Sequence, residues 1–261
     1  MRGDVSSSPF DLSGRIAVVL GGTSGIGRTL AIGLAAAGAD VVATGRREAL
    51  VAEIATEIEA HGRRTMRQPC DVTDNTAVLT LRDRCLRELG HADILICAAG
   101  ITTRVPTLAM REAEWQRVID TNLTGTLRAC RAFAEPMLER RDGRIITVAS
   151  LSSYLGFFEV AAYTASKSAV AGLTRALAVE WASRGVRVNA LVPGVFQTDL
   201  NRALLDSARG HELLARTPMA RFGRVDELVG AALFLASDAS SFVTGQLIAV
   251  DGGFLASGVN Q

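Results

Sequence analysis

The sequence predicts an α/β domain built on one parallel sheet with helices on both faces. Short apolar runs rich in valine and isoleucine alternate with longer helical runs, a pattern typical of right-handed βαβ units. The first apolar run, residues 15–20 (RIAVVL), leads straight into the glycine turn GGTSGIG and then into a helical segment of small and apolar residues. Ligands of such sheets bind beyond the carboxyl ends of the strands, so functional residues are expected there.

The expected elements follow this alternation along the chain. Strands are expected at residues 15–20, 40–44, 64–69, 93–97, 143–150, 186–192 and 246–250. The main helical segments are expected at 28–38, 48–61, 107–140 (one or two helices), 163–183 and 225–236. Each candidate functional residue discussed below lies at the end of one of these strands or soon after it.

The segment before the last expected helix has a different character. Residues 195–224 are weakly patterned, with turn signals at Gly210 and Pro218, which predicts a lid over a bound substrate. The first residues, 1–11, form a polar tail. We therefore interpret residues 1–261 as a single domain with an N-terminal tail and a substrate lid.

Composition and charge argue against several classes of function. Hydrophobic residues make up 48% and charged residues 21%, which favours one well-buried core. The formal net charge is +1, so neither a nucleic-acid partner nor an anionic membrane is expected. The four cysteines and three histidines lack metal-ligand spacing, and no apolar run is long enough to span a membrane. We expect no metal site, no disulfide framework and a cytoplasmic location.

The glycine turn is a candidate dinucleotide site. Gly21, Gly25 and Gly27 allow the backbone to turn sharply and to approach a ligand, and the following helix presents unpaired N–H groups to a pyrophosphate. The spacing is Gly-x-x-x-Gly-x-Gly, which differs from the general Gly-x-Gly-x-x-Gly fingerprint. The alternative is a tight turn between strand and helix that binds nothing.

The end of the second expected strand bears on coenzyme choice. An acidic residue there would favour NAD(H), whereas an arginine suits the 2′-phosphate of NADP(H). This chain has Arg46 and Arg47 and no acid. The pattern favours NADP(H), with NAD(H) possible, and the alternative is a pair of solvated charges at a helix start.

Three further positions are candidates for cofactor contact. Asp71 could meet the adenine edge or could cap the next helix. The small residues 98–100 leave room for a cofactor across the strand ends, and Thr198 could cap a helix, contact the cofactor or do both.

Tyr163 and Lys167 are the candidate acid/base pair. On a helix they stand at i and i+4, so the phenol and the ammonium lie on one face. A nearby cation favours the phenolate, so we expect Lys167 to lower the pKa of Tyr163. Ser150, at the end of a strand, could hold a substrate oxygen beside the phenol, and Asn122 could bond a carbonyl or a water within a local helix distortion. Alone, Tyr-x-x-x-Lys also occurs by chance on many helices.

Taken together, GGTSGIG, CDVTD, CAAG, Asn122, Ser150, YTASK and PGVFQT occur in an order and spacing that resemble the short-chain dehydrogenase/reductase family, over residues 12–254. Within it, the segments GITTRVPTLAM, ARTPMAR and VDGGFLASG are most similar to bacterial gluconate 5-dehydrogenases and related sugar-acid dehydrogenases.

The resemblance implies a single Rossmann-type, doubly wound domain with seven parallel strands, assembled as a homotetramer. It implies hydride transfer between a nicotinamide and the carbonyl or CH–OH of a small polyol, sugar acid or related compound. Tyr163 would be the acid/base, Lys167 its partner, Ser150 the residue that orients the substrate oxygen, and Asn122 part of a proton relay. The positions matching cofactor contacts are Gly21, Thr23, Ser24, Gly25, Ile26, Gly27, Arg46, Asp71, Val72, Ala99, Gly100, Tyr163, Lys167, Pro193, Gly194, Phe196 and Thr198.

Substrate contacts are expected at Arg104, Ser150, Ser152 and Tyr163. Arg104 could grip a carboxylate with its planar fork, or it could be an interface or surface charge. The chain departs from the family in one place, because Cys97 and Ala98 stand where two asparagines are common and cannot reproduce their hydrogen bonds.

Two rival functions remain at this point. One is a 3-oxoacyl-acyl-carrier-protein reductase, which keeps the chemistry and changes the substrate. The other is a non-catalytic dinucleotide sensor, which would need the glycine turn but not the residues of the proton shuttle.

Overall fold

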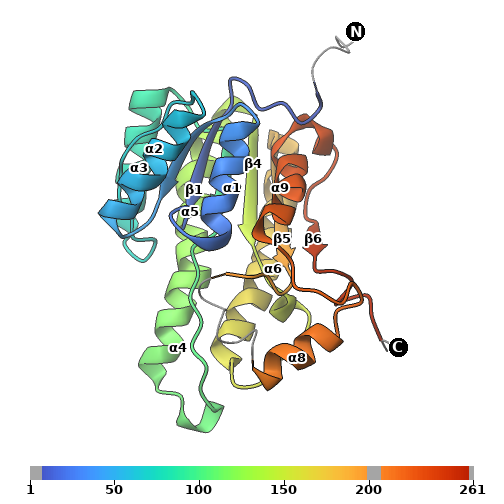
Figure 1. Ribbon diagram of the computed structural model, residues 1–261. Helices are drawn as coiled ribbons and strands as arrows, with labels where there is room; N and C mark the ends of the chain where they lie inside the picture. Colours follow the sequence, from blue (N-terminus) through green and yellow to red (C-terminus); the bar gives the residue numbers. More distant parts are fainter. Residues whose placement is uncertain (1–7, 199–206, 259–261) are drawn as a thin grey trace.

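The computed structural model describes residues 8–198 and 207–258, and it contains one parallel sheet between two layers of helices (Figure 1). Six strands run in the order β2-β1-β3-β4-β5-β6. Their bounds are β1 Ile16–Leu20, β2 Asp40–Thr44, β3 Ile94–Cys97, β4 Gly143–Val148, β5 Val186–Pro193 and β6 Leu247–Val250. The chain order reverses beside β1, where β2 lies on one side and β3 on the other. The predicted α/β architecture is confirmed.

Strands β1 to β5 are buried on both faces because their side chains contribute to two hydrophobic cores, whereas β6 at the edge is partly exposed. In β1, Val18 and Leu20 belong to the core under α3 (Asn75–Leu89), α5 (Gly125–Arg140) and α6 (Ala161–Trp181). Ala17 and Val19 point the other way, into the core under α1 (Gly25–Ala36), α2 (Glu48–Ala60) and α9 (Val229–Ala236). This explains why the strands read as continuous apolar runs, without the alternation of a sheet that faces water.

The prediction of a seventh strand at residues 64–69 is wrong. The segment lies beside β2, but only at its ends do backbone bonds join the two: from Val41 N–H to the Arg64 carbonyl and from Cys70 N–H to the Gly45 carbonyl, both at 3.0 Å. Side chains take the place of a regular ladder. The Asp40 carboxylate accepts the Arg64 N–H at 2.7 Å, and Pro69 has no N–H to offer.

The long helical region expected at 107–140 is divided. A short 3-10 turn (η1, Thr107–Ala109) and α4 (Glu112–Ile119) lead into a π-helical turn (η2, Asp120–Thr124) and then α5. Helix α6 begins two residues earlier than expected. The final helical segment begins with a 3-10 turn (η5, Val225–Leu228), which leads into α9. Further 3-10 turns lie at η3 (Leu151–Ser153), η4 (Ala182–Arg184) and η6 (Asp238–Ser240).

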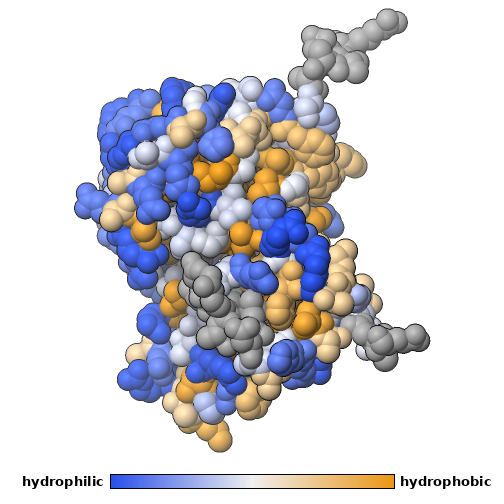
Figure 2. Space-filling view, in the orientation of Figure 1, coloured by the Kyte–Doolittle hydropathy of each residue, from blue (hydrophilic) through white to orange (hydrophobic). Residues whose placement is uncertain are grey.

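The expected lid contains one described helix, α8 (Ala208–Ala215), and residues 199–206 of the lid lie outside the described part of the chain. In Figure 1, α8 lies beyond the carboxyl ends of the strands, near the start of α6. The surface over α2 and α3 is mainly hydrophilic, whereas hydrophobic residues gather toward α9 and β6 (Figure 2). Among the described residues, no helix combines the length and the apolar character needed to cross a bilayer.

Candidate active site

The glycine turn after β1 is shaped by close backbone contacts. Gly21 has φ +77°, and a Cβ there would lie 2.5 Å from the Ala99 nitrogen. A Cβ on Gly27 would lie 2.1 Å from the Gly21 carbonyl oxygen. Only glycine fits at either position, and the turn therefore packs tightly against the segment that follows β3. The geometry matches a cradle for a ligand that approaches the backbone.

The start of α1 is open to an anion. The helix begins at Gly25, and Ser24, its N-cap residue, makes no side-chain capping bond. The first N–H groups of a helix have no partner within it and favour negative charge. Ile26 is the second residue of this turn, and Thr23 is buried against Gly45, at the end of β2. The turn thus joins the ends of two neighbouring strands.

Arg46 and Arg47 lie just past β2, where the sequence predicted coenzyme selection. Both are exposed, and neither forms an ion pair with a described residue. The arrangement fits a 2′-phosphate, which would supply the missing negative charge.

Asp71 orders the next loop. Its carboxylate accepts the Thr73 N–H at 2.9 Å and the Thr73 hydroxyl at 2.8 Å. The cap of α3 is Asp74, which accepts the Thr76 N–H at 2.8 Å. Asp74, and not Asp71, therefore caps the helix, so the capping interpretation of Asp71 is wrong. Val72 is packed against Gly125, where a Cβ would lie 2.8 Å from the valine side chain.

Asn122 lies in the π-helical turn and is fully buried. Its amide nitrogen donates to the Ile101 carbonyl at 2.9 Å and to the Ser166 hydroxyl at 3.0 Å, and its oxygen accepts the Ile101 N–H at 2.8 Å. Asn122 thus fixes the segment after β3 to α6. The expected bond to a carbonyl within a helix distortion is present, and the proton relay stays a prediction.

Ser150 follows β4 and begins η3. Its hydroxyl accepts the Ser152 N–H at 3.1 Å. The turn is fastened to α6 by two more bonds, from the Ser153 hydroxyl to the Lys167 carbonyl at 2.8 Å and from the Ser168 hydroxyl to the Ser152 carbonyl at 3.1 Å. Ser152 is buried. These bonds fix Ser150 relative to the helix that carries Tyr163.

Tyr163 and Lys167 share a face of α6, and the Lys167 Nζ lies 5.8 Å from the centre of the phenol ring. The ammonium is buried and donates to the Val148 carbonyl at 2.6 Å. Burial lowers the pKa of Lys167 to about 8, and the Cys97 thiol opposes that fall. A Cβ on Gly100 would lie 3.5 Å from both the Lys167 Nζ and the Asn122 Oδ1, so three predicted positions meet here.

The expected effect of Lys167 on the phenol is wrong for the protein by itself. Burial raises the pKa of Tyr163 above its ordinary value, and the hydrogen bond with Ser150 opposes that rise. The Lys167 ammonium is directed at the Val148 carbonyl, and burial of the phenol decides the direction of its pKa shift. The phenol is protonated and bonded to Ser150, an arrangement that can donate a proton to a substrate oxygen.

Cys97 and Ala98, the departure from the family pattern, fill their places without a polar link to the cofactor side. Cys97 is buried and hydrogen-bonded to the Cys130 thiol of α5, which together with burial raises its pKa well above the usual range. Ala98 donates its N–H to the Leu20 carbonyl at 2.9 Å. The thiol pair joins β3 to α5 where the family commonly has an asparagine.

The end of β5 lies against the chain that follows β6. Pro193 is the last residue of β5, and the Gly194 N–H donates to the Val250 carbonyl at 2.9 Å. Phe196 is buried and pairs with Gly223 through an isolated bridge. Thr198 is the last described residue before the gap.

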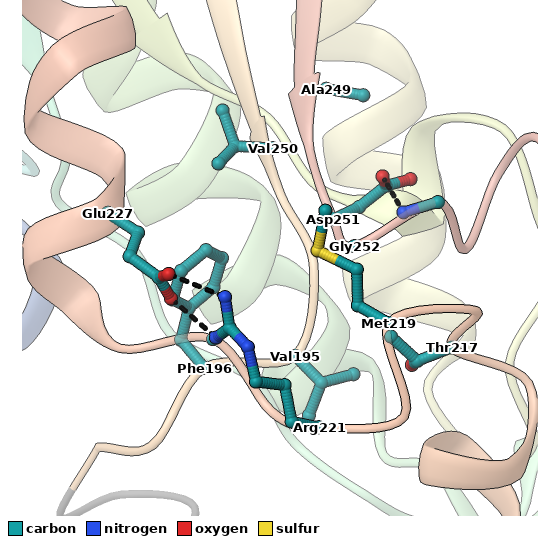
Figure 3. A pocket seen from close by; sticks show the side chains of 12 residues that line it. Val195, Phe196, Thr217, Met219, Arg221, Glu227, Ala249, Val250, Asp251 and Gly252 are labelled. Atoms are coloured by element: carbon teal, nitrogen blue, oxygen red, sulfur yellow. Dashed lines mark hydrogen bonds and ion pairs between the residues drawn. The ribbon is translucent and has the colours of Figure 1, made fainter.

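A cavity of about 360 Å³ adjoins Phe196 (Figure 3). Its charged groups are already engaged. Arg221 donates to both oxygens of Glu227, at 2.8 and 2.6 Å, and the Asp251 carboxylate accepts the Gly253 N–H at 2.9 Å. This ion pair was not predicted from the sequence.

Arg104 lies on the wall of a second cavity, of about 530 Å³, between α8 and the loop before α6. Its Nε is 2.9 Å from an oxygen of Glu159, and Val105 N–H donates to the Glu159 carbonyl at 2.9 Å. Glu159 has φ +63°, a conformation that is uncommon outside glycine. The sequence located Arg104 near a cleft but did not reveal its acidic partner.

Known proteins share this arrangement over nearly the whole chain. A family profile described as Enoyl-(Acyl carrier protein) reductase matches residues 21–255. The gluconate 5-dehydrogenase of Gluconobacter oxydans is 41% identical over 249 residues, covering 95% of this chain and 97% of that protein. The 3-oxoacyl-acyl-carrier-protein reductase FabG of Escherichia coli is 38% identical over 244 residues, covering 94% and 98%.

A solved structure is similar to the same degree. The crystal structure of a gluconate 5-dehydrogenase from Burkholderia cenocepacia J2315, in complex with NADP and tartrate, superposes with a TM-score of 0.92 at 41% identity. The match covers 95% of this chain and 98% of that chain.

Proposed function

Because the chain belongs to the short-chain dehydrogenase/reductase family, we propose that it transfers a hydride between NADP(H) and the CH–OH or carbonyl carbon of a small sugar acid or polyol. The observation that carries the proposal is the Tyr163 phenol, bonded to Ser150 and lying over the same helix face as Lys167. A dinucleotide sensor would have no use for this group. The sugar-acid class is supported by relatives named for gluconate and deoxygluconate oxidation.

The residues divide into a coenzyme part and a reaction part. The glycine turn and the start of α1 would hold the pyrophosphate, Arg46 the 2′-phosphate, and Asp71 with Val72 the adenosine. Ala99, Gly100, Pro193, Gly194, Phe196 and Thr198 would line the path toward the nicotinamide. When bound, the nicotinamide supplies or accepts the hydride at C4, and the protein's own groups handle the proton.

In the direction of reduction, Ser150 and Tyr163 bond the substrate oxygen, and the phenol gives its proton as the oxygen gains charge. Lys167 would hold the nicotinamide ribose and, with a pKa of about 8, could return a proton to the phenol. Asn122 completes the relay by fixing the segment beside Lys167. Ser152 supports the Ser150 loop, and Arg104, paired with Glu159, would form part of the wall beside the substrate.

The arrangement of the whole molecule belongs to the same proposal. We place the protein in the cytoplasm, as one domain with a tail at 1–11 and a lid at 195–224. All four cysteines are free and buried, which agrees with a reducing location. A homotetramer is supported by the exposed apolar side chains of Phe242 and Val179, which are 103% and 83% exposed. Sedimentation of the purified protein tests this.

The test of the function is a cofactor oxidation assay. Purified protein is mixed with NADPH or NADH and with a keto-sugar acid, a neutral ketose or a 3-oxoacyl thioester. Selective oxidation of NADPH with the keto-sugar acid is the expected result. Turnover of the thioester alone would instead assign the activity of the FabG-type relatives. Cofactor binding without turnover of any compound would favour the sensor.

A further inference from the structure

The cavity between α8 and the loop before α6 carries an uncompensated positive charge. Three arginines line it, and two of them have acidic partners within ion-pair distance. Arg104 is paired with Glu159 at 2.9 Å, and Arg216 is paired with Glu212 at 3.0 Å. Arg209 has no carboxylate within ion-pair distance among residues 8–198 and 207–258. Its Nη1 donates only to the Phe158 carbonyl, at 3.1 Å.

The location of this charge relates it to the reaction. Residues 155–158 form one wall of the cavity and lie between Ser150 and Tyr163 in the chain. The turn that precedes this wall is fastened to α6 by the bonds of Ser153 and Ser168. Neither Ser150 nor Tyr163 lines the cavity. The loop that joins Ser150 to Tyr163 along the chain therefore forms part of the cavity wall, which connects the cavity to the reacting groups through a short stretch of chain.

The chemistry of the walls defines what that far end is. Leu213 and Phe254 are buried apolar residues of the lining, and Phe157 packs on Phe254 with ring centres 6.2 Å apart. Arg209 is half-buried beside them. A guanidinium that has no carboxylate within ion-pair distance in the described part of the chain is suited to an oxyanion, which it can bind through two parallel hydrogen bonds.

We infer that Arg209 binds the anionic end of the substrate, a carboxylate, in this cavity and thereby selects sugar acids over neutral sugars. This inference rests on the proposed function. It reassigns the role that the sequence suggested for Arg104, because Glu159 already neutralises Arg104. Recognition then uses two points: the reacting oxygen at Ser150 and Tyr163 from the core, and the carboxylate at Arg209 from the lid helix.

The experiment compares a charged with a neutral substrate in the full-length protein with NADPH. Arg209→Gln should raise KM for a keto-sugar acid by roughly 10- to 100-fold, as expected for loss of a charged hydrogen bond, and leave KM for a ketose of equal carbon number nearly unchanged. The KM of Arg209→Lys for the keto-sugar acid should lie between those of wild type and Arg209→Gln, since lysine keeps the charge but lacks the planar guanidinium. Arg87→Gln, the same change on the exposed surface of α3, is the matched control and should resemble wild type.

Several outcomes separate this inference from the proposed function. Equal changes in KM for acid and ketose would overturn the inference and leave the dehydrogenase intact. If no sugar acid is turned over, calorimetry with gluconate in the presence of NADP+ still tests the cavity. Wild-type binding lost in Arg209→Gln would support the carboxylate site, and no wild-type binding would overturn it. Tighter binding of a sugar phosphate than of gluconate would overturn the assignment to a carboxylate.

Discussion

The two ends of the sheet differ in whether a buried charge has a partner of opposite charge. At the amino end of the strands, Asp93 is 1% exposed and is surrounded by donors. It accepts the Ile16 N–H at 2.8 Å and the Arg140 guanidinium at 2.7 Å, and His91 lies 3.0 Å away. At the carboxyl end, Lys167 is similarly buried but donates to the Val148 carbonyl, and no carboxylate of a described residue lies within ion-pair distance.

The amino end continues as a network across β4 and β5. Arg144 is buried and bonds Asp142 and Asp238, and Arg15 bonds Asp142 at 2.7 Å. Arg187 donates to the carbonyls of η6, and burial among the other arginines lowers its pKa to about 10. These side chains join the starts of three strands to the end of α9. The charges of Arg15 and Arg144 are compensated by Asp142 and Asp238, so these pairs contribute order at little net gain in stability.

This difference indicates which end serves function. A buried ammonium without a counter-charge destabilises the fold. The same burial lowers the pKa of Lys167 toward neutrality, beside the Tyr163 phenol. Residues held in this way are typical of sites where activity opposes stability. Substitutions at the two ends should therefore have opposite effects on stability.

The largest expected effect is on turnover and concerns the carboxyl end. Tyr163→Phe removes the proton donor and should reduce kcat by about 10²- to 10⁴-fold. NADPH affinity, measured by fluorescence titration, should stay within about twofold because the phenyl ring keeps its packing. Turnover equal to wild type would contradict the assignment of Tyr163 as the acid/base.

The next effect is on stability and concerns the amino end. Asp93→Ala leaves the Ile16 N–H and the Arg140 guanidinium without their buried acceptor. We expect the free energy of unfolding to fall by about 3–5 kcal/mol, measured by urea denaturation. Glu59→Ala on the exposed surface, where the carboxylate also bonds an arginine, is the matched control and should change it by less than about 1 kcal/mol. Similar losses in both variants would contradict the comparison.

Sequence reasoning predicted which edge of the sheet the candidate residues share, but it did not predict the direction of the pKa shift of Tyr163. The ends of strands can be read from apolar runs and glycines, and so Gly21, Ser150 and Tyr163 were placed at one edge of the sheet. The pKa of Tyr163 depends on how deeply the phenol is buried and on where the Lys167 ammonium is directed. Neither follows from an i, i+4 spacing.

The other errors also arise from side-chain partners distant in the chain. The prediction of a seventh strand was wrong because the Asp40 carboxylate accepts a hydrogen bond from the Arg64 N–H, which a β-ladder would use. The acidic partner of Arg104 is 55 residues away at Glu159. Local patterns reveal which residues form an element, but they do not reveal which polar groups will already be engaged once the chain has folded.

A smaller effect sharpens the comparison at Lys167. Its pKa of about 8 in the folded protein is below the 10.5 of an ordinary lysine, which applies to the unfolded chain. Between these values the unfolded chain binds more protons, so wild-type stability should rise with pH, by at most about 3 kcal/mol. Lys167→Met should be more stable than wild type at about pH 7 and should lack this rise. Urea denaturation from about pH 7 to pH 10 measures it. A wild-type curve that is flat or falls over this range would contradict the buried, uncompensated lysine.

The smallest expected effect concerns an exposed charge at the carboxyl end. Arg46 has no acidic partner among the described residues, so replacing it should leave the fold nearly unchanged. Arg46→Asp should weaken NADPH binding by roughly tenfold or more and leave NADH binding within about twofold, because only the former carries a 2′-phosphate. Arg47→Asp is the matched variant, with the same charge change one residue away, and should have the weaker effect. Equal losses for both coenzymes would mean that Arg46 acts through the general potential of the site, and a larger loss in Arg47→Asp would move the phosphate contact to its neighbour.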